Sequence, residues 1–316
     1  MQGLDLMGTA ALIVAAGRPA DPKAFDPSQK LGGISLLMRA VTTFRKAGVR
    51  EIVVVTGYCG KKLGRQLART GVICLPNDSW RNSDMLESVK IGASYLKGRF
   101  DRIFITPVDT PMFSVKTLRL LLASQAPASA PVVQNTMGHP LLIQDSSLHL
   151  ILGYEGEGGL REAVRSLVGY TAVAVEDPGT LMDLQTHPLA ADSGRLPPRQ
   201  PLTPQFSLSL VGEFPFFDQE ACLLLNLIAR TRSVRAACQQ MNLSYSKGWE
   251  ILNNMERQLG FAVLERHPGG PSGGWSQLSD QGRRLVSSYT CLCHVAGDFL
   301  ETEFETLFQW LCQEPG

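Results

Sequence analysis

The chain has 316 residues, which is long for a single hydrophobic core and predicts two domains. Its 30 basic and 29 acidic residues leave a formal charge of +1, so the whole molecule has no strong attraction for nucleic acids, membranes or polyanionic substrates, and any such attraction has to be local. The seven cysteines form no CxxC pair, which favours a reducing cytoplasmic environment over a disulfide framework.

The first half of the chain predicts an α/β domain. AALIVAAG, residues 10–17, reads as a buried strand and not as a signal peptide, because no basic segment precedes it and Gly and Pro follow it. Helical patterns then alternate with short β-branched runs: ISLLMRAVTTFRKAG, EIVVVTG, KKLGRQLARTG, VICLPND, DMLESVKIGASYLKG, DRIFITPVD and VKTLRLLLAS. This alternation is typical of a Rossmann-like, mostly parallel sheet covered by helices.

Two segments of this domain are placed to carry chemistry. Asp109 directly follows the strand DRIFITPV, and the carboxyl ends of parallel strands are where such sheets bind ligands. The loop VAAGRPADPK, residues 14–23, ends the first strand with small residues that let backbone N–H groups approach phosphate oxygens. Lys23 or Lys30 would meet the remaining charge, although tight turns use the same small residues for packing alone.

The second half predicts a different domain. Residues 192–205, DSGRLPPRQPLTPQ, contain four prolines and predict an extended linker, so we expect one domain over residues 1–191 and another over 206–316. Two short helical patterns, SVRAACQQMN and SYSKGWEILNNMERQLG, precede a Gly-rich segment, which is the pattern of a winged helix-turn-helix. A long helix is expected from about Asp280 to Leu311.

The charge of this second domain favours nucleic acid. Residues 230–284 carry eight Lys or Arg and four acids, a local excess of +4. Ser244 is expected to cap the second short helix, which places Ser246 and Lys247 in its first turn, where a recognition helix meets bases and phosphates. We predict contacts with double-stranded DNA through Arg235, Ser244, Ser246, Lys247 and Arg266. An ordinary solvated helix-turn-helix used for protein contact is the open alternative.

The last helix predicts a homodimer. Asp298, Glu301, Glu303 and Glu305 make it acidic, so it is a poor DNA ligand, yet it also carries Phe308 and Trp310. We expect it to pair with its copy, because two half-sites require two recognition helices.

Residues 9–191 resemble the MobA-like nucleotidyltransferases, and most closely the molybdenum cofactor cytidylyltransferase branch. The motifs that carry the resemblance occur in the family's order: VAAGRP, LGGISLL, VVVTGY, NDSW, DMLESVKIG, PVDTPM, MGHPLL and DLQTHP. The resemblance implies that Asp109 holds Mg²⁺ with help from Asp183, that CTP is the substrate and that a molybdopterin-type cofactor is the acceptor. It further implies catalytic roles for Lys23 and His139, and nucleotide contacts by Ala15, Ala16, Gly17, Lys30, Asn77, Ser88 and Lys90.

Several of these residues also have a simpler explanation. Asp109 could stabilise a turn, His139 could be an ordinary core histidine, and Lys90 could lie on a solvated helix face. The chain also departs from the family, since its phosphate loop is shorter and lacks an Arg, and Gln185 replaces a second acid in DLQTHP. A regulator that senses nucleotide or cofactor without turning it over therefore stays open as the alternative function.

Residues 232–289 resemble the N-terminal DNA-binding domain of the molybdate-responsive, ModE-type regulators, which are related to LysR-type winged helices. SVRAACQQMNLSYSKGWEILNNME matches their helix-turn-helix, and LERHPGGPSGGWSQLSDQGRRLVSSY matches their wing. Both resemblances point to molybdenum. The expected protein is a cytoplasmic nucleotidyltransferase with a DNA-binding module and no membrane association. A winged helix that serves only for dimerisation is a further possibility.

Overall fold

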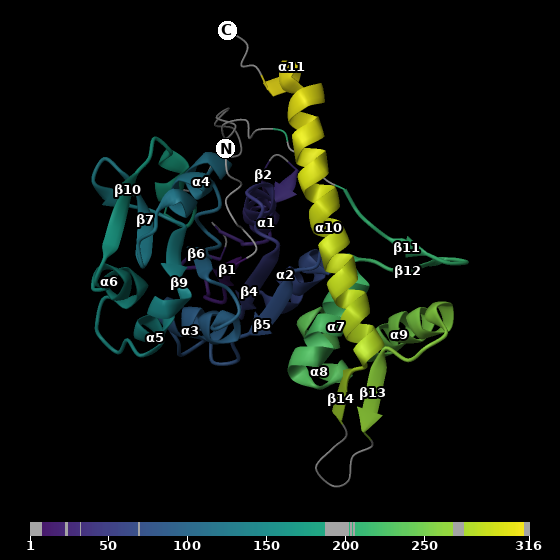
Figure 1. Cartoon of the computed structure of the whole chain (residues 1–316). Helices are drawn as coiled ribbons and strands as arrows, with labels where there is room; N and C mark the ends of the chain where they lie inside the picture. Colours follow the sequence, from purple (N-terminus) through teal and green to yellow (C-terminus); the bar gives the residue numbers. More distant parts are fainter. Residues whose placement is uncertain are drawn as a thin grey trace. The chain divides into compact units, whose positions relative to one another are not determined.

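The structure is a computed structural model that describes residues 8–22, 25–31, 33–68, 70–186, 202, 204, 206–267 and 275–312. The chain forms two compact units, of which the first holds most residues before the expected linker and the second most residues after it (Figure 1). The expected linker, residues 192–205, lies almost wholly outside the described residues, so its extended form stays a prediction.

The first unit is built on a mixed, mostly parallel sheet. The strand order is β10-β7-β9-β6-β1-β4-β5, and β8 pairs with β7. Their bounds are β1 (Thr9–Ala15), β4 (Glu51–Thr56), β5 (Ile73–Pro76), β6 (Arg102–Pro107), β7 (Ala128–Val133), β8 (Thr136–Met137), β9 (Leu141–Gln144) and β10 (Tyr170–Ala174). Strand β1 is parallel to both of its neighbours, and β9 runs antiparallel to β6 and β7.

The strand order reverses beside β1. From β1 the chain proceeds to β4 and β5, and then returns to β6 on the other side of β1. In open sheets of this kind, ligands bind at the carboxyl ends of the strands where the order reverses. The ends of β1 and β6 therefore mark the expected site.

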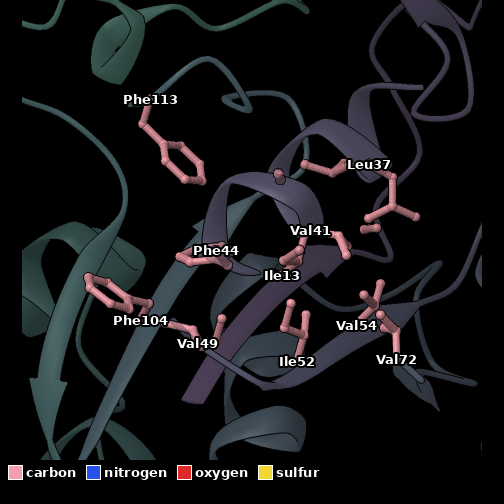
Figure 2. Close-up of a cluster of buried hydrophobic side chains, with 14 of the residues drawn as sticks. Ile13, Leu37, Val41, Phe44, Val49, Ile52, Val54, Val72, Phe104 and Phe113 are labelled. Carbon is pink, nitrogen blue, oxygen red and sulfur yellow. The ribbon is translucent and has the colours of Figure 1, made fainter. Parts of the chain in front are cut away.

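Helices and short elements surround this sheet. They are β2 (Lys30–Leu31), β3 (Ile34–Ser35), α1 (Leu36–Lys46), α2 (Gly60–Leu67), α3 (Met85–Leu96), α4 (Val115–Ala123), α5 (Asp145–Leu152), α6 (Gly159–Arg165) and the 3₁₀ helix η1 (Pro178–Leu181). Helix α1 begins because the Ser35 hydroxyl accepts a hydrogen bond from the Met38 N–H at 3.2 Å. Figure 2 shows the apolar face of α1 packed over β1 and β4.

The core between α1 and the sheet follows from helical and strand periodicity. Leu37, Val41 and Phe44 lie on one face of α1 and are fully buried (Figure 2). The Phe44 ring lies 5.5 Å from the Phe104 ring and 5.1 Å from the Phe113 ring. Each such buried side chain contributes about 1.5–3 kcal/mol of transfer free energy. This core fixes the ends of β1 and β6 relative to each other.

The second unit is a winged helix-turn-helix. Its elements are β11 (Leu210–Val211), β12 (Pro215–Phe217), α7 (Gln219–Thr231), α8 (Val234–Gln240), α9 (Tyr245–Leu259), β13 (Leu264–His267), β14 (Trp275–Leu278), α10 (Asp280–Leu307) and α11 (Gln309–Cys312). Helix α7 contacts α8, α9 and α10, and β13 and β14 form the antiparallel wing (Figure 1). No helix within the described ranges is both long and apolar enough to span a bilayer.

The predicted fold class is confirmed: a mostly parallel sheet with helices is followed by a winged helix-turn-helix and a long final helix. Two features were not expected. Strand β9 is antiparallel, and the hairpin β11–β12 precedes α7.

Candidate functional site

The structure brings the two predicted metal ligands of the first unit close together. Asp109 lies just beyond β6, where its backbone carbonyl accepts a hydrogen bond from the Leu184 N–H at 2.9 Å. The side-chain amide of Gln185 donates to Asp109 Oδ2. Asp183 is near enough for its charge to act on the Asp109 carboxyl. The segment that carries Asp183 is therefore docked on the end of β6.

The segment that leads to Asp183 is anchored by contacts with residues far away in the sequence. The Asp177 carboxylate accepts hydrogen bonds from the Ser114 N–H at 2.8 Å and from the Thr117 hydroxyl at 2.6 Å. A Cβ on Gly179 would lie 2.2 Å from the carbonyl oxygen of Met112, so only glycine allows this close approach. Sequence reasoning missed both Asp177 and Gly179, although their place before the DLQTHP segment was a signal.

The electrostatics of the pair favour a cation. Burial raises the pKa of the Asp109 carboxyl, the Asp183 charge raises it further, and the Gln185 hydrogen bond opposes the rise. Asp183 Oδ1 accepts the Gln185 N–H at 2.8 Å, which orients that carboxylate. A divalent cation would offset the charge of both carboxylates.

The donor set fits magnesium. The described residues hold no cluster of three or more His, Cys, Asp or Glu side chains able to bind a metal ion. Mg²⁺ usually takes one or two protein carboxylates and completes its octahedron with waters and substrate phosphates. Two aspartates at the carboxyl end of β6 suit Mg²⁺ better than they suit an ion that needs a full cage of protein ligands.

The predicted nucleotide loop lies at the end of β1. Ala15 and Ala16 are buried, and Gly17 is exposed, with no atom of the described residues within 4 Å of the place a Cβ would take. The Tyr58 N–H donates to the Ala16 carbonyl at 2.9 Å, and a Cβ on Gly57 would lie 2.4 Å from that oxygen. The ends of β1 and β4 therefore meet tightly, while Gly17 leaves its backbone open to a ligand.

Three lysines were predicted to contact the nucleotide near this loop. Lys23 lies outside the described residues, and Lys30 is exposed in β2. The Lys90 ammonium pairs with Glu87 at 2.9 Å on α3. Their contacts with a nucleotide stay predictions.

Asn77 and Ser88 are brought together by the loop between β5 and α3. Asn77 Nδ2 donates to the Ser88 hydroxyl at 3.0 Å and to the Ser83 hydroxyl at 2.9 Å, while Asn77 Oδ1 accepts the Ser79 N–H at 3.0 Å. Both residues are buried. These hydrogen bonds stabilise the loop, and contact of either residue with a base stays a prediction.

Sequence reasoning missed an aromatic and cationic cluster at the same edge. The Tyr58 and Trp80 rings pack edge to face, 5.4 Å between centroids. The Arg18 guanidinium lies 5.9 Å from the Tyr58 ring, and that of Arg81 lies 4.5 Å from the Trp80 ring. The sequence signal was the placement of Tyr and Trp at the ends of successive strands. These arginines add positive charge to a loop that lacks the family's own Arg.

His139 is held in place by its backbone. Its N–H donates to the Thr180 carbonyl at 2.9 Å, and a Cβ on the preceding Gly138 would lie 2.6 Å from that oxygen. Burial lowers the pKa of His139 to about 4, assisted by the positive charge of Arg161 and opposed by a backbone hydrogen bond with Ile105 and by the charge of Asp183. The ring is therefore neutral near pH 7 and lies within electrostatic reach of Asp183.

In the second unit, α9 begins with the side-chain cap that was expected at Ser244. The Ser244 hydroxyl accepts the Lys247 N–H at 3.1 Å and lies 3.1 Å from the Ser246 hydroxyl. The Lys247 ammonium pairs with Glu250 at 2.8 Å. The Arg235 guanidinium stacks on the exposed Tyr245 ring at 5.0 Å. These side chains gather at one helix end, and DNA contact by them stays a prediction.

The wing is tied to α9 by stacked side chains. Arg266 pairs with Glu256 at 2.9 Å and lies over the Trp249 ring at 4.6 Å. On the neighbouring strand, the Trp275 ring stacks on His267 at 3.8 Å, with the Arg232 guanidinium 5.5 Å from it. Arg232 and His267 were not predicted as site residues.

Two parts of the chain match known protein families. Residues 11–172 match the family described as MobA-like NTP transferase domain, and residues 221–283 match bacterial regulatory helix-turn-helix protein, lysR family.

Several known proteins are similar to parts of this chain. The molybdenum-pterin-binding protein MopB of Rhodobacter capsulatus is 36% identical over 70 residues, covering 22% of this chain and 26% of MopB. The DNA-binding transcriptional dual regulator ModE of Escherichia coli (strain K12) is 30% identical over 80 residues, covering 25% of this chain and 30% of ModE. The matches thus span less than a third of these relatives. A solved nucleotidyl transferase from Methanothermobacter thermautotroptrophicus is 21% identical, covers 56% of this chain and 91% of its own, and has a TM-score of 0.48.

Proposed function

The chain belongs to the MobA-like NTP transferase family, and we propose that its first unit transfers CMP from CTP to a molybdopterin-type molybdenum cofactor. We propose that its second unit binds double-stranded DNA. The nucleotidyltransferase domain and the regulatory helix-turn-helix domain follow from the two family matches. The choice of molybdenum is supported by similarity to MopB, named as molybdenum-pterin-binding, and to ModE.

The pair Asp109 and Asp183, beside the end of β1, is the observation that carries the enzymatic proposal. In nucleotidyl transfer, an oxygen of the acceptor attacks the α-phosphorus of CTP. A new P–O bond forms, the bond from the α-phosphorus to the bridging oxygen breaks, and pyrophosphate leaves with that electron pair. Mg²⁺, when bound, offsets the negative charge that develops on the pyrophosphate.

We assign different roles in this reaction to different residues of the first unit. Asp109 and Asp183 would hold the cation, and the Gln185 amide would keep the Asp109 carboxylate in one orientation. The exposed backbone of Gly17 would face the phosphates, and Arg18 and Arg81 would offset their charge.

The enzymatic test follows α-labelled CTP. The protein with CTP, Mg²⁺ and the cofactor should release pyrophosphate and move the label to the cofactor. Asp109→Asn should lower the rate by about 10²- to 10³-fold, because charge stabilisation at the site is lost. Glu176→Gln, which changes an exposed acid of the same unit, is the matched control. Full activity in Asp109→Asn, or a preference for GTP, would contradict the assignment.

One observation favours the non-catalytic alternative. Where the family has a second acid, Gln185 places a neutral amide on Asp109 Oδ2, so fewer charges hold the metal. A regulator that senses CTP would bind it, release no pyrophosphate, and change its DNA affinity when CTP is added. Label transfer by the wild-type protein rules this alternative out.

The DNA-binding part of the proposal is supported by the capped start of α9 and the stacked arginines around it. Lys247→Ala should weaken binding to all DNA sequences alike and reduce the slope of log K against log salt by about 1. Arg257→Ala, at the far end of the same helix, is the control. A wild-type protein with no salt-sensitive DNA binding would favour a winged helix used only for dimerisation.

We extend the proposal to a homodimer through α10. Leu292, Val295 and Phe299, spaced by three and four residues, are all exposed on this helix, and Leu307 and Trp310 are exposed beyond them. A stripe of this spacing is what a helix presents to a partner helix. A second copy of the chain is the occupant that also supplies the second recognition helix.

A further inference from the structure

Three helices cover one side of the first unit's sheet. Helices α1, α2 and α4 contribute side chains to a single hydrophobic core, and Ile13 of β1 belongs to the same core. Successive residues of a strand face opposite sides of a sheet. Helix α3 lies on the other side of β1, because a Cβ on its Gly92 would be 2.2 Å from the side chain of Leu12. The two sides of the sheet are therefore covered by different helices.

The charges of the first unit are divided unevenly between these two sides. Helices α1, α2 and α4 contain eight Lys or Arg and no Asp or Glu. Helix α3 and the helices that it contacts, α5 and α6, contain three Lys or Arg and three Asp or Glu. Five basic side chains on α2 and α4 are exposed: Lys61, Lys62, Arg65, Lys116 and Arg119.

Most of these exposed charges are not neutralised locally. Lys62 has an acidic partner in Asp26. The other four form no ion pair with any residue that the structure describes. We call the surface formed by these four side chains, on α2 and α4, the basic face. It presents positive charge to the surroundings of the molecule.

Helix stability does not explain the placement of these cations. Lys61 and Lys62 lie in the first turn of α2 and Lys116 lies in the first turn of α4, and neither turn contains an acid. The first turn is the positive end of the helix dipole, so a lysine there disfavours the helix. Residues that oppose local stability without a compensating contact are expected where a protein has a function to perform.

The basic face suits duplex DNA better than it suits a membrane. The apolar sides of the three helices are buried in the core, and Leu120 is the one large apolar side chain that their described residues expose. A helix that binds a membrane surface inserts an apolar face, and no such face is available here. Duplex DNA carries one negative charge for about every 1.7 Å of its axis, and binding it requires no apolar contact.

The spacing of the helices also fits a duplex. Helix α1 lies between α4 and α2 (Figure 1). Neighbouring packed helices are about 8–10 Å apart, so α2 and α4 are about 16–20 Å apart. Their cations would therefore meet phosphates about five or six base pairs apart, at about 3.4 Å for each base pair.

We propose that the basic face binds the phosphate backbone of double-stranded DNA, as a second contact in addition to that of α9. The proposal rests on the proposed function, because it adds a surface for the same DNA that the second unit binds. Contacts with phosphates carry no direct sequence information. The basic face therefore raises the affinity for DNA and leaves the choice of bases to α9.

The test measures binding of the full chain to a random-sequence duplex of about 40 base pairs, by fluorescence anisotropy at several salt concentrations. The slope of log K against log salt changes by about 0.9 for each phosphate contact, so Arg65→Gln/Arg119→Gln should reduce it by about 2. The matched control, Lys97→Gln/Arg165→Gln, removes two exposed charges from the α3 and α6 side and should keep the wild-type slope.

Two further measurements separate the basic face from α9 and from damage to the fold. Lys247→Ala should reduce the slope by about 1 in the wild type and in Arg65→Gln/Arg119→Gln alike, because the two surfaces contact different phosphates. Both double variants should melt near the wild-type temperature. A lower slope is then due to lost charge and not to unfolding.

An unchanged slope in Arg65→Gln/Arg119→Gln would overturn the proposal, as would an equal loss in the control. Cosedimentation with phosphatidylglycerol vesicles tests the other anionic surface. Vesicle binding that the Arg65 and Arg119 substitutions abolish, together with an unchanged DNA slope, would assign the basic face to a membrane.

Failure of the basic face is distinguishable from failure of the proposed function. A slope that responds to Lys247→Ala and not to the Arg65 and Arg119 substitutions rejects the basic face alone. The reverse result rejects α9 as the DNA contact and keeps the basic face. A full chain without salt-dependent DNA binding rejects both.

Discussion

Asp109 is a residue at which stability and function oppose each other. Its folded-state pKa is raised above the ordinary 3.8, chiefly by burial, so the folded protein disfavours the ionised form. The group favours folding most at low pH, and that contribution is lost as pH rises through the folded pKa. Without ligands, Asp109→Asn should therefore melt at a higher temperature than the wild type at pH 7, and the gap should narrow toward pH 4.

Calorimetry at several pH values measures this gap. Adding Mg²⁺ and CTP should reverse the order, since ligands that bind only the intact site stabilise the wild type alone. A variant that is less stable than the wild type at every pH would show that the carboxylate is structural.

His139 predicts a pH dependence of the opposite sign. Its pKa is lowered from 6.5 to about 4, so the unfolded chain binds the proton more readily than the folded protein between these values. The stabilisation is complete above pH 6.5 and is lost as pH falls toward 4. The free energy of unfolding in urea should fall more between pH 6.5 and pH 4 for the wild type than for His139→Gln. The exposed His149→Gln should behave as the wild type, and equal slopes for all three would refute the prediction.

At the scale of elements, the crossing of α8 and α9 depends on one glycine. A Cβ on Gly248 would lie 2.2 Å from Cys238 Sγ. Gly248→Ala gains about 1 kcal/mol of helix propensity, and overpacking costs about 1–3 kcal/mol, so we expect net destabilisation. Adding Cys238→Ala removes the clashing sulfur and should recover part of the loss. Denaturant unfolding of both single variants and the double variant measures this coupling, and simple additivity would contradict it.

Two substitutions at the start of α9 distinguish the effect of helix capping from the effect of DNA contact. Ser244→Ala removes the side-chain bond to the Lys247 N–H and should cost about 1 kcal/mol of stability. Ser244→Asp keeps a capping oxygen and should keep the stability, but its negative charge should weaken DNA binding. Melting temperatures and fluorescence anisotropy on the same samples test the two effects. Unchanged DNA affinity in Ser244→Asp would place this helix end away from the phosphates.

At the scale of the whole molecule, we expect one substitution on α10 to change the oligomeric state. Phe299 is 62% exposed in the middle of the apolar stripe of α10, so Phe299→Asp should convert a dimer to a monomer and weaken binding to a two-half-site DNA. Sedimentation velocity measures the first effect. Ser287→Asp, on the same helix but outside the stripe, is the control. A wild-type protein that sediments as a monomer would reject the dimer.

The sequence supported the architecture better than the fine geometry of the site. Strands such as TAALIVA are apolar after the first residue, which predicts a central parallel strand, and β1 is one. The direction of β9 was not predictable, because LLIQ has the same pattern in either direction. The resemblance paired Asp109 with Asp183, whereas the anchor at Asp177 depends on packing between segments far apart in the chain.

Helix α10 is 28 residues long, about 42 Å at 1.5 Å per residue. If two copies join along it, the distance between their α9 helices is set by where the two long helices cross. The bases contacted by the protein and the number of base pairs between the two contacts would then be determined by different helices. Substitutions in α9 would change the preferred bases at constant separation, and substitutions along α10 would change the separation for the same bases.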